Sequence, residues 1–280
     1  MENHKLTAKE IGIYKCYLKK EEKSENTVQK YVRDVSAFFA SSPGIITKES
    51  VIAYKNLLCS QGYKAQSINS MLASLNSFFA FMGWNDLTVR SLKLQRKIYC
   101  EESREISRGE YERLCRTAER KGKERLSLII QTICGTGIRV SELEYVTVEA
   151  VRRGEAVVSL KGKTRTVLIV RDLQKKLMRY IANRGIGSGA VFITGSGKPV
   201  DRSNVWREMK SLCRDAGVDP SKVFPHNLRH LFARIFYAMD RDIAKLADIL
   251  GHSSIETTRL YIITTVKEHR RQMENMRLII

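Results

Sequence analysis

Three short segments in the second half of the chain contain residue types that suit chemistry on a phosphate group. They are GTGIRVSEL at residues 135–143, PHNLRHLFAR at residues 225–234 and LGHSSIETTRLYI at residues 250–262. Arg139 stands where a helix is expected to begin, and His226 and Arg229 are three residues apart, which places them on one helix face. His252 falls in a junction between two expected helices, and Tyr261 lies about two turns into the second. Such arginine and histidine side chains hold phosphate oxygens through charge-assisted hydrogen bonds.

Each segment alone also has an ordinary structural explanation. Arg139 and Glu142 can form a surface ion pair, a lone tyrosine usually packs in a core, and His230 is interpreted as a core or supporting histidine. A fourth candidate is the basic turn KGKTR, from which Lys161 or Lys163 can project into a cleft. A basic turn on a basic protein is by itself a weak signal.

The combination favours phosphoryl transfer without a metal. Arginines neutralise the charge that develops on the non-bridging oxygens, a tyrosine is the nucleophile, and a lysine gives a proton to the leaving 5′ oxygen. The sequence contains no HExxH motif, no CxxC pair and no obvious carboxylate cluster for two-metal chemistry. We therefore expect neither a metal site nor a cofactor.

The elements that must position these residues follow from apolar spacing and capping signals. Three helices are expected in the first part of the chain, within residues 24–42, 47–62 and 67–84. A polar, basic linker is expected over 85–105, followed by a helix that starts at Ser107, where Glu110 completes a capping box. Helical patterns continue to about Cys134. Two short strands, 156–160 and 166–170, are joined by the turn 161–165, and Ser253 with Glu256 is expected to cap the helix that carries Tyr261.

Composition sets the wider limits. The chain has 280 residues, 43% of them hydrophobic, and a formal net charge of +19, which is heavier after Glu105. This charge favours a polyanionic partner over a membrane surface. The six scattered cysteines argue against a disulfide framework, and neither a signal peptide nor a membrane-spanning run is visible. We expect a protein of the reducing cytoplasm.

The three motifs together resemble the tyrosine recombinase (phage integrase) family. Arg139 in GTGIRVSEL, His226 and Arg229 in HNLRH, and His252 with Tyr261 in LGHSSIETTRLY carry the resemblance, which covers nearly the whole chain. It implies a mainly helical fold with a small β-sheet. A helical, SAM-like core-binding domain would span residues 1–84, and an α+β catalytic domain with a C-terminal tail helix would span 106–280. The length is similar to that of Xer-type and mobile-element recombinases.

The resemblance also implies the roles of the residues. Tyr261 would attack the scissile phosphate and form a 3′-phosphotyrosyl link, while Arg139, Arg229 and His252 hold the phosphate. His226 would assist proton transfer, and the hairpin lysine would protonate the leaving oxygen. The family's hairpin often reads KGxKxR, whereas KGKTR is one residue shorter, so Lys161 fits best and Lys163 remains the alternative.

The partners implied by the resemblance are double-stranded DNA with inverted-repeat core sites and three further copies of the chain. The homo-tetramer would join two DNA sites by exchange of the C-terminal tail. Accessory DNA-bending proteins are possible further partners, and no membrane partner is expected. Two alternatives stay open. One is a type IB topoisomerase-like enzyme that relaxes DNA, and the other is a DNA-binding accessory protein without catalytic activity.

Overall fold

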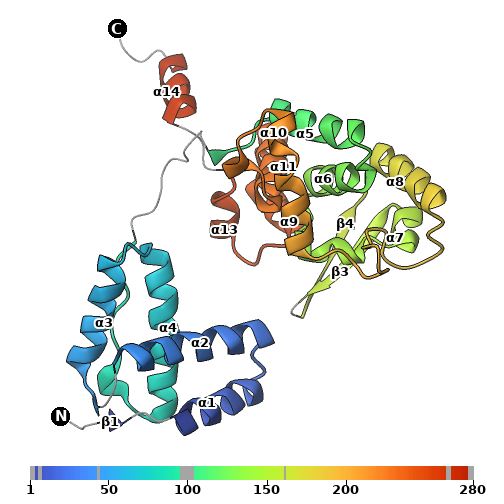
Figure 1. The fold of residues 1–280 in the computed structure, drawn as a ribbon. Helices are drawn as coiled ribbons and strands as arrows, with labels where there is room; N and C mark the ends of the chain where they lie inside the picture. Colours follow the sequence, from blue (N-terminus) through green and yellow to red (C-terminus); the bar gives the residue numbers. More distant parts are fainter. Residues whose placement is uncertain are drawn as a thin grey trace. The chain divides into compact units, whose positions relative to one another are not determined.

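Helices form most of both parts of the chain, as the apolar spacing predicts. The computed structural model describes residues 4–5, 8–42, 45–94, 104–160, 162–262 and 266–276. The chain divides into two units, residues 1–96 and 97–280 (Figure 1). None of the helices in the described ranges is long and apolar enough to cross a membrane.

The described residues of the first unit form four α-helices. Its elements are β1 (His4–Lys5), α1 (Ala8–Lys20), α2 (Glu25–Ser41), β2 (Ile45–Ile46), α3 (Lys48–Ser60), α4 (Ala65–Met82) and the 3-10 helix η1 (Asn85–Leu87). Ser24 caps α2 and Thr47 caps α3, so two of the predicted helix starts are confirmed. The inward residues predicted for the third helix are all buried in α4, namely Ile68, Leu72, Leu75, Phe78 and Phe79.

The prediction of a linker over 85–105 is wrong for its first half. Leu87 and Val89 are buried in the core of the first unit. The side chain of Asn76, on α4, pairs with both the N–H and the C=O of Val89, at 3.1 and 2.9 Å. Asn69 pairs in the same way with Leu92, at 2.7 and 2.9 Å. Side-chain amides thus take the place of a neighbouring strand, a pairing that leaves no periodic pattern in the sequence.

The second unit surrounds α6 (Glu124–Thr136), whose residues are mostly buried. The other elements are α5 (Arg108–Arg120), η3 (Val140–Tyr145), α7 (Val148–Arg153), β3 (Glu155–Leu160), β4 (Lys163–Leu168), α8 (Arg171–Arg184), α9 (Arg202–Lys210), α10 (Cys213–Ala216), η4 (Pro220–Lys222), α11 (Pro225–Asp240), α12 (Ile243–Leu250), α13 (Ile255–Arg259) and α14 (Val266–Asn275). The capping box of Ser107 and Glu110 is present, which confirms the predicted start of α5. α6 contacts α5, α8, α9 and α11.

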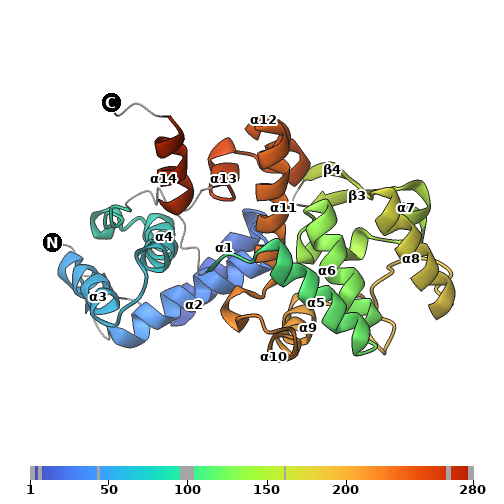
Figure 2. The ribbon, with the colours of Figure 1, turned by 90° about the horizontal axis from the view of Figure 1, so that it is seen from above.

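The β3–β4 hairpin corrects the predicted turn. Its antiparallel register runs from Glu155 opposite Leu168 to Leu160 opposite Lys163. The stretch 163–165, expected in the turn, therefore belongs to β4, because its backbone pairs with 158–160. Gly162 has a φ of +73°, a left-handed conformation that glycine adopts without strain and that permits a tight turn. Lys161 lies outside the described residues. Figure 2 shows α12 beside β4, so the hairpin contacts the helix that precedes His252.

The segment that carries Tyr261 also differs from its prediction. Ser254, not Ser253, is the N-cap of α13, and its side chain makes no capping hydrogen bond. α13 is only five residues long, so Tyr261 lies just beyond its end and not two turns inside a helix. The backbone N–H of Tyr261 donates to the carbonyl of Thr258 at 2.9 Å. This turn directs the tyrosine ring back towards α11.

Candidate active site

Arg139 and Glu142 form the first part of the site, where α6 ends at the left-handed Gly137. The backbone N–H and the guanidinium of Arg139 each donate to a different carboxylate oxygen of Glu142, both at 2.8 Å. The Glu142 side chain is 1% exposed, so this is a buried carboxylate and not the surface pair of the simpler interpretation. Burial raises the pKa of Glu142, but the hydrogen bonds from Arg139 and the charge of Arg165 outweigh it and lower the pKa overall.

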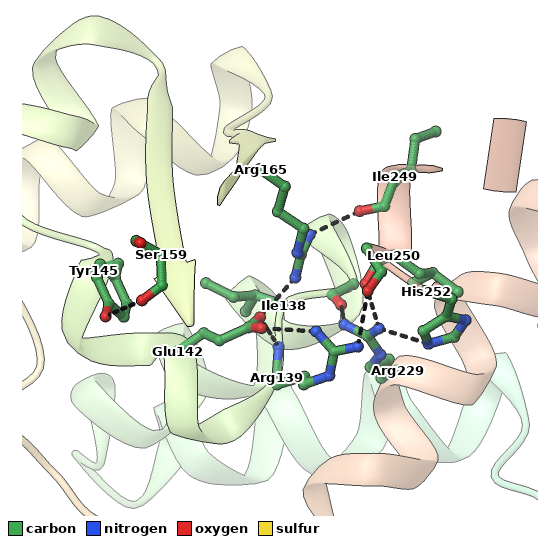
Figure 3. A network of polar contacts seen from close by, with 12 residues as sticks. Ile138, Arg139, Glu142, Tyr145, Ser159, Arg165, Arg229, Ile249, Leu250 and His252 are labelled. Carbon is green, nitrogen blue, oxygen red and sulfur yellow. Dashed lines mark hydrogen bonds and ion pairs between the residues drawn. The ribbon is translucent and has the colours of Figure 1, made fainter. Parts of the chain in front are cut away.

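Arg165, on β4, is a site residue that the sequence reasoning missed. Its guanidinium donates to Glu142 Oε2 at 2.6 Å and to the carbonyl of Ile249 at 2.7 Å (Figure 3). Arg165 pairs with the inward-facing Val158 and lies on the same face of β4 as the buried Val167. The signal in the sequence was thus an arginine at an inward position of a strand. The sequence pattern does not reveal it, because the pattern predicts a turn at this residue.

Arg229, on α11, is 1% exposed and lies at the centre of the site. It donates to the carbonyls of Gly137 and Leu250, the latter at 2.7 Å, and its NH2 group lies 3.0 Å from Nε2 of His252. Because a guanidinium has no acceptor atom, this Nε2 must accept, and Nδ1 of His252 carries the proton. Nδ1 then donates to Thr258 Oγ1 at 2.9 Å. The tautomer and the orientation of His252 are thereby fixed.

The ring of Tyr261, 7% exposed, packs among these groups. It stacks on His230 with a centroid distance of 4.2 Å and an interplanar angle of 25°. The His226 ring meets it edge-on at 5.2 Å, and the His252 ring lies at 4.9 Å. The guanidinium of Arg229 lies 5.8 Å from the ring centroid, within cation–π range. The structure thus brings together Tyr261, one arginine and all three histidines of the motifs.

The electrostatics of the site favour an anionic ligand. Three guanidinium groups converge here. Those of Arg139 and Arg165 bond the carboxylate of Glu142, whereas that of Arg229 interacts with this carboxylate only through its charge. Burial lowers the pKa of Arg229 to about 10, and the charge of Arg139 adds to that effect. The pKa of His252 is lowered to about 4, first by burial and then by the charge of the arginines, so the imidazole is neutral at neutral pH.

Two buried donors remain unsatisfied. The Nε atoms of Arg165 and Arg229 are buried and have no hydrogen-bond partner in the described part of the chain. The site therefore holds more positive charge and more donors than its own acceptors satisfy, which suits a phosphate group.

The sequence-predicted residues can now be placed. Five of them converge within the second unit, from the N-cap of η3, α11, the α12–α13 junction and the turn after α13, namely Arg139, His226, Arg229, His252 and Tyr261. Lys161 lies outside the described residues, and so does the side chain of Lys163, although its backbone is part of β4. The described residues contain no group of three or more potential metal-ligating side chains.

Two family models match the chain. Residues 104–268 match the model of the phage integrase family, and residues 11–86 match that of the phage integrase N-terminal SAM-like domain. The chain belongs to the phage integrase family. The family resemblance inferred from the motifs and the two-part, mainly helical fold are therefore confirmed, and the chain is an enzyme of the site-specific recombinase class.

Individual relatives extend over the whole length. The chain is 29% identical over 290 residues to tyrosine recombinase XerA of Pyrococcus furiosus, an alignment that covers 100% of this chain and 98% of the relative. Tyrosine recombinase XerD of Halalkalibacterium halodurans is 27% identical over 269 residues, with 86% and 88% covered. Both relatives are recombinases of Xer type.

Solved structures show the same fold. A crystal structure of XerA recombinase superposes with a TM-score of 0.54 at 25% identity and covers 97% of this chain and 99% of the other. A lambda integrase dimer bound to a COC′ core site gives a TM-score of 0.73 at 19% identity, with 91% and 95% covered. A Tn1549 transposon integrase in complex with transposon right end DNA gives 0.72 at 17% identity, with 95% and 98% covered. The last two matches concern the fold alone.

Proposed function

We propose that the chain cuts and rejoins DNA strands at specific sites through a covalent tyrosine intermediate. The Tyr261 oxygen attacks the scissile phosphorus, a 3′-phosphotyrosyl bond forms, and the bond to the 5′ oxygen breaks. The leaving oxygen takes a proton from Lys161 and becomes a free 5′-hydroxyl. The observation that carries this proposal is the packing of Tyr261 against Arg229 and three histidines of a positively charged site.

The geometry suggests how the other groups contribute. Arg139 and Arg229 would hold the non-bridging oxygens and stabilise their charge in the transition state. His252 would join them in its protonated form, in which Nε2 becomes a donor, because the negative charge of a bound phosphate raises the pKa of the imidazole. The pKa of His226 is lowered to about 4, first by burial and then by neighbouring His230 and Arg229, so its imidazole is neutral at neutral pH. Since a neutral imidazole can accept a proton, His226 is suited to assist deprotonation of Tyr261. The phosphotyrosyl bond conserves the energy of the broken bond, so the scheme requires neither ATP nor a metal.

The DNA partner follows from the same proposal. The lambda and Tn1549 integrases are bound to core-site and transposon-end DNA in their structures, and this chain shares their fold. We propose double-stranded DNA with inverted-repeat core sites as the substrate. Four chains would assemble on two such sites by exchange of their C-terminal tails, with accessory DNA-bending proteins as further partners.

The nucleophile is tested with Tyr261→Phe. Because the target sequence is unknown, the probe is a duplex selected from a randomised pool by binding to the wild-type protein, here called the selected duplex. The wild type should form a denaturant-resistant adduct at one position of this duplex, which maps the scissile phosphate. Tyr261→Phe should bind the duplex with a similar Kd and form no adduct, because it lacks the attacking oxygen. An adduct that persists in Tyr261→Phe would place the nucleophile elsewhere.

The lysine is tested by the need for a proton on the leaving group. Lys161→Ala should slow cleavage of the selected duplex, and a 5′-thiolate leaving group at the mapped position should restore the rate, since a thiolate leaves without protonation. Lys163→Ala is the matched control from the same hairpin. Rescue of Lys163→Ala alone would transfer the role to Lys163.

A further inference from the structure

The end of α12 is held by three arginines at once. The carbonyls of three consecutive residues each accept a hydrogen bond from a guanidinium. Ile249 accepts from Arg165 at 2.7 Å, Leu250 from Arg229 at 2.7 Å, and Gly251 from Arg139 at 3.3 Å. The last carbonyls of a helix have no partner within the helix and form its negative end, so guanidinium groups stabilise it. His252 is the next residue along the chain, and Tyr261 follows after α13.

The three arginines differ in their access to a ligand. The side chain of Arg139 is 37% exposed, whereas that of Arg165 is 12% exposed and is enclosed between β4, η3 and α12. In the proposed reaction, Arg139 and Arg229 turn donors towards the phosphate. When these two arginines bind the phosphate, the hydrogen bond from Arg165 to the carbonyl of Ile249 continues to fix the end of α12 (Figure 3).

Arg165 also shares its carboxylate with a phosphate-binding arginine. Glu142 accepts from Arg165 through Oε2 at 2.6 Å and from the guanidinium of Arg139 through Oε1 at 2.8 Å. Because Glu142 is buried, removal of Arg165 leaves its charge with one guanidinium in place of two, and the pair with Arg139 must readjust. The position of Arg139 therefore depends on Arg165.

The backbone is adapted to this arginine at Gly251. This residue has a φ of +63°, and a Cβ placed on it would lie 2.7 Å from Nε of Arg165 and closer still to Cδ. Such a contact is far shorter than van der Waals distance. The arginine stem therefore lies directly on the backbone at the start of the His252 junction, an approach that only glycine permits.

We propose that Arg165 is a positioning residue for strand cleavage. It fixes the end of α12 and the carboxylate of Glu142, and through them it sets Arg139, His252 and Tyr261 in register with the scissile phosphate. Because Arg165 is part of β4, its bond to Ile249 also connects the hairpin that carries Lys161 and Lys163 to the end of α12. This inference rests on the proposed function of the site.

The first test compares charged and neutral scissile phosphates. Arg165→Ala should bind the selected duplex within about threefold of the wild-type Kd, but form the adduct about 10²-fold more slowly, a loss expected from misplacement by about 1 Å. On the same duplex with a methylphosphonate at the mapped position, the deficit should shrink at least tenfold, because a neutral phosphate has less need of Arg139 and Arg229. Arg165→Lys should be intermediate, since an ammonium cannot replace the planar fork.

The second test moves Arg165 without removing it. Gly251→Ala should slow cleavage of the natural duplex to a similar extent, and it should add little in an Arg165→Ala background, where its clash is absent. Gly185→Ala is the matched control. Gly185 is also left-handed, with a φ of +62°, and ends α8, but a Cβ there meets nothing within 4 Å. Gly185→Ala should therefore cleave at the wild-type rate.

The outcomes distinguish failure of the proposed function from failure of the role of Arg165. A wild-type protein that forms no adduct would overturn the proposed function. A wild-type adduct together with equal deficits of Arg165→Ala on both substrates, or with no deficit at all, would overturn the role of Arg165 alone. If Arg165→Ala does not fold, Arg165→Lys and Gly251→Ala decide the question by the same comparison of substrates.

Discussion

At the scale of single residues, the placement of Tyr261 depends on His230. The two rings stack face to face. Nδ1 of His230 lies 3.8 Å from the carboxylate of Glu105, which also accepts a hydrogen bond from Arg234 at 3.2 Å. The pKa of His230 is lowered to about 4 by burial and by the charge of Arg229, so the imidazole is neutral at neutral pH. It therefore contacts Tyr261 as a flat, uncharged ring.

His230→Ala tests this interpretation. An aromatic pair contributes about 0.5–1.5 kcal/mol, so its loss should slow adduct formation on the selected duplex about two- to tenfold. His230→Phe is the matched control, which keeps the stacking and should keep the wild-type rate. Between pH 6 and 9 both variants should follow the pH profile of the wild type, because His230 does not titrate there. A His230→Phe variant as slow as His230→Ala would show that the imidazole nitrogens matter.

At the scale of helices and strands, asparagine side chains of α4 pair with backbone groups of residues 89–92 that have no neighbouring strand among the described residues. The side chain of Asn76 satisfies the backbone N–H and C=O of Val89, and both lie where water is largely excluded. Asn76→Ala should lower the free energy of unfolding by about 1–3 kcal/mol, the usual effect of leaving buried polar groups without partners. Amide exchange at Val89 should accelerate. Asn56→Ala, on the exposed face of α3, should change neither quantity.

The same elements show what the sequence could and could not predict. The helices were predictable because their apolar residues recur at three or four positions, and the catalytic motifs because residues such as Arg139 and Tyr261 stand in recognisable segments. The role of Arg165 was not predictable, because it depends on the register of β3 with β4. The polar sequence of residues 163–165 is the same whether their backbone pairs with β3 or forms a turn. The position of Tyr261 was also not predictable, because α13 ends after five residues and Tyr261 follows it in a turn.

At the scale of the whole molecule, the positive charge is carried by both units, which match separate models of one family. Under the proposed function, duplex DNA would be bound by both units. Phosphate contacts from both units would then fix the position of the catalytic unit on the site, without reading the sequence themselves.

The last prediction concerns assembly and rests on α14. Met273 and Met276 are 70% and 58% exposed, and the sequence continues with Leu278, Ile279 and Ile280. Exposed apolar residues at one end of a helix favour a protein partner, which we take to be a neighbouring copy of the chain.

Deletion of residues 268–280 should leave binding to one selected duplex intact but abolish pairing of two duplexes and strand exchange. Met273→Ser with Met276→Ser should have the same effect, whereas Glu274→Ser, equally exposed on the same helix, should not. Native-gel stoichiometry and a two-site recombination assay measure both steps. Recombination by the deleted protein at the wild-type rate would mean that the tail serves only its own subunit.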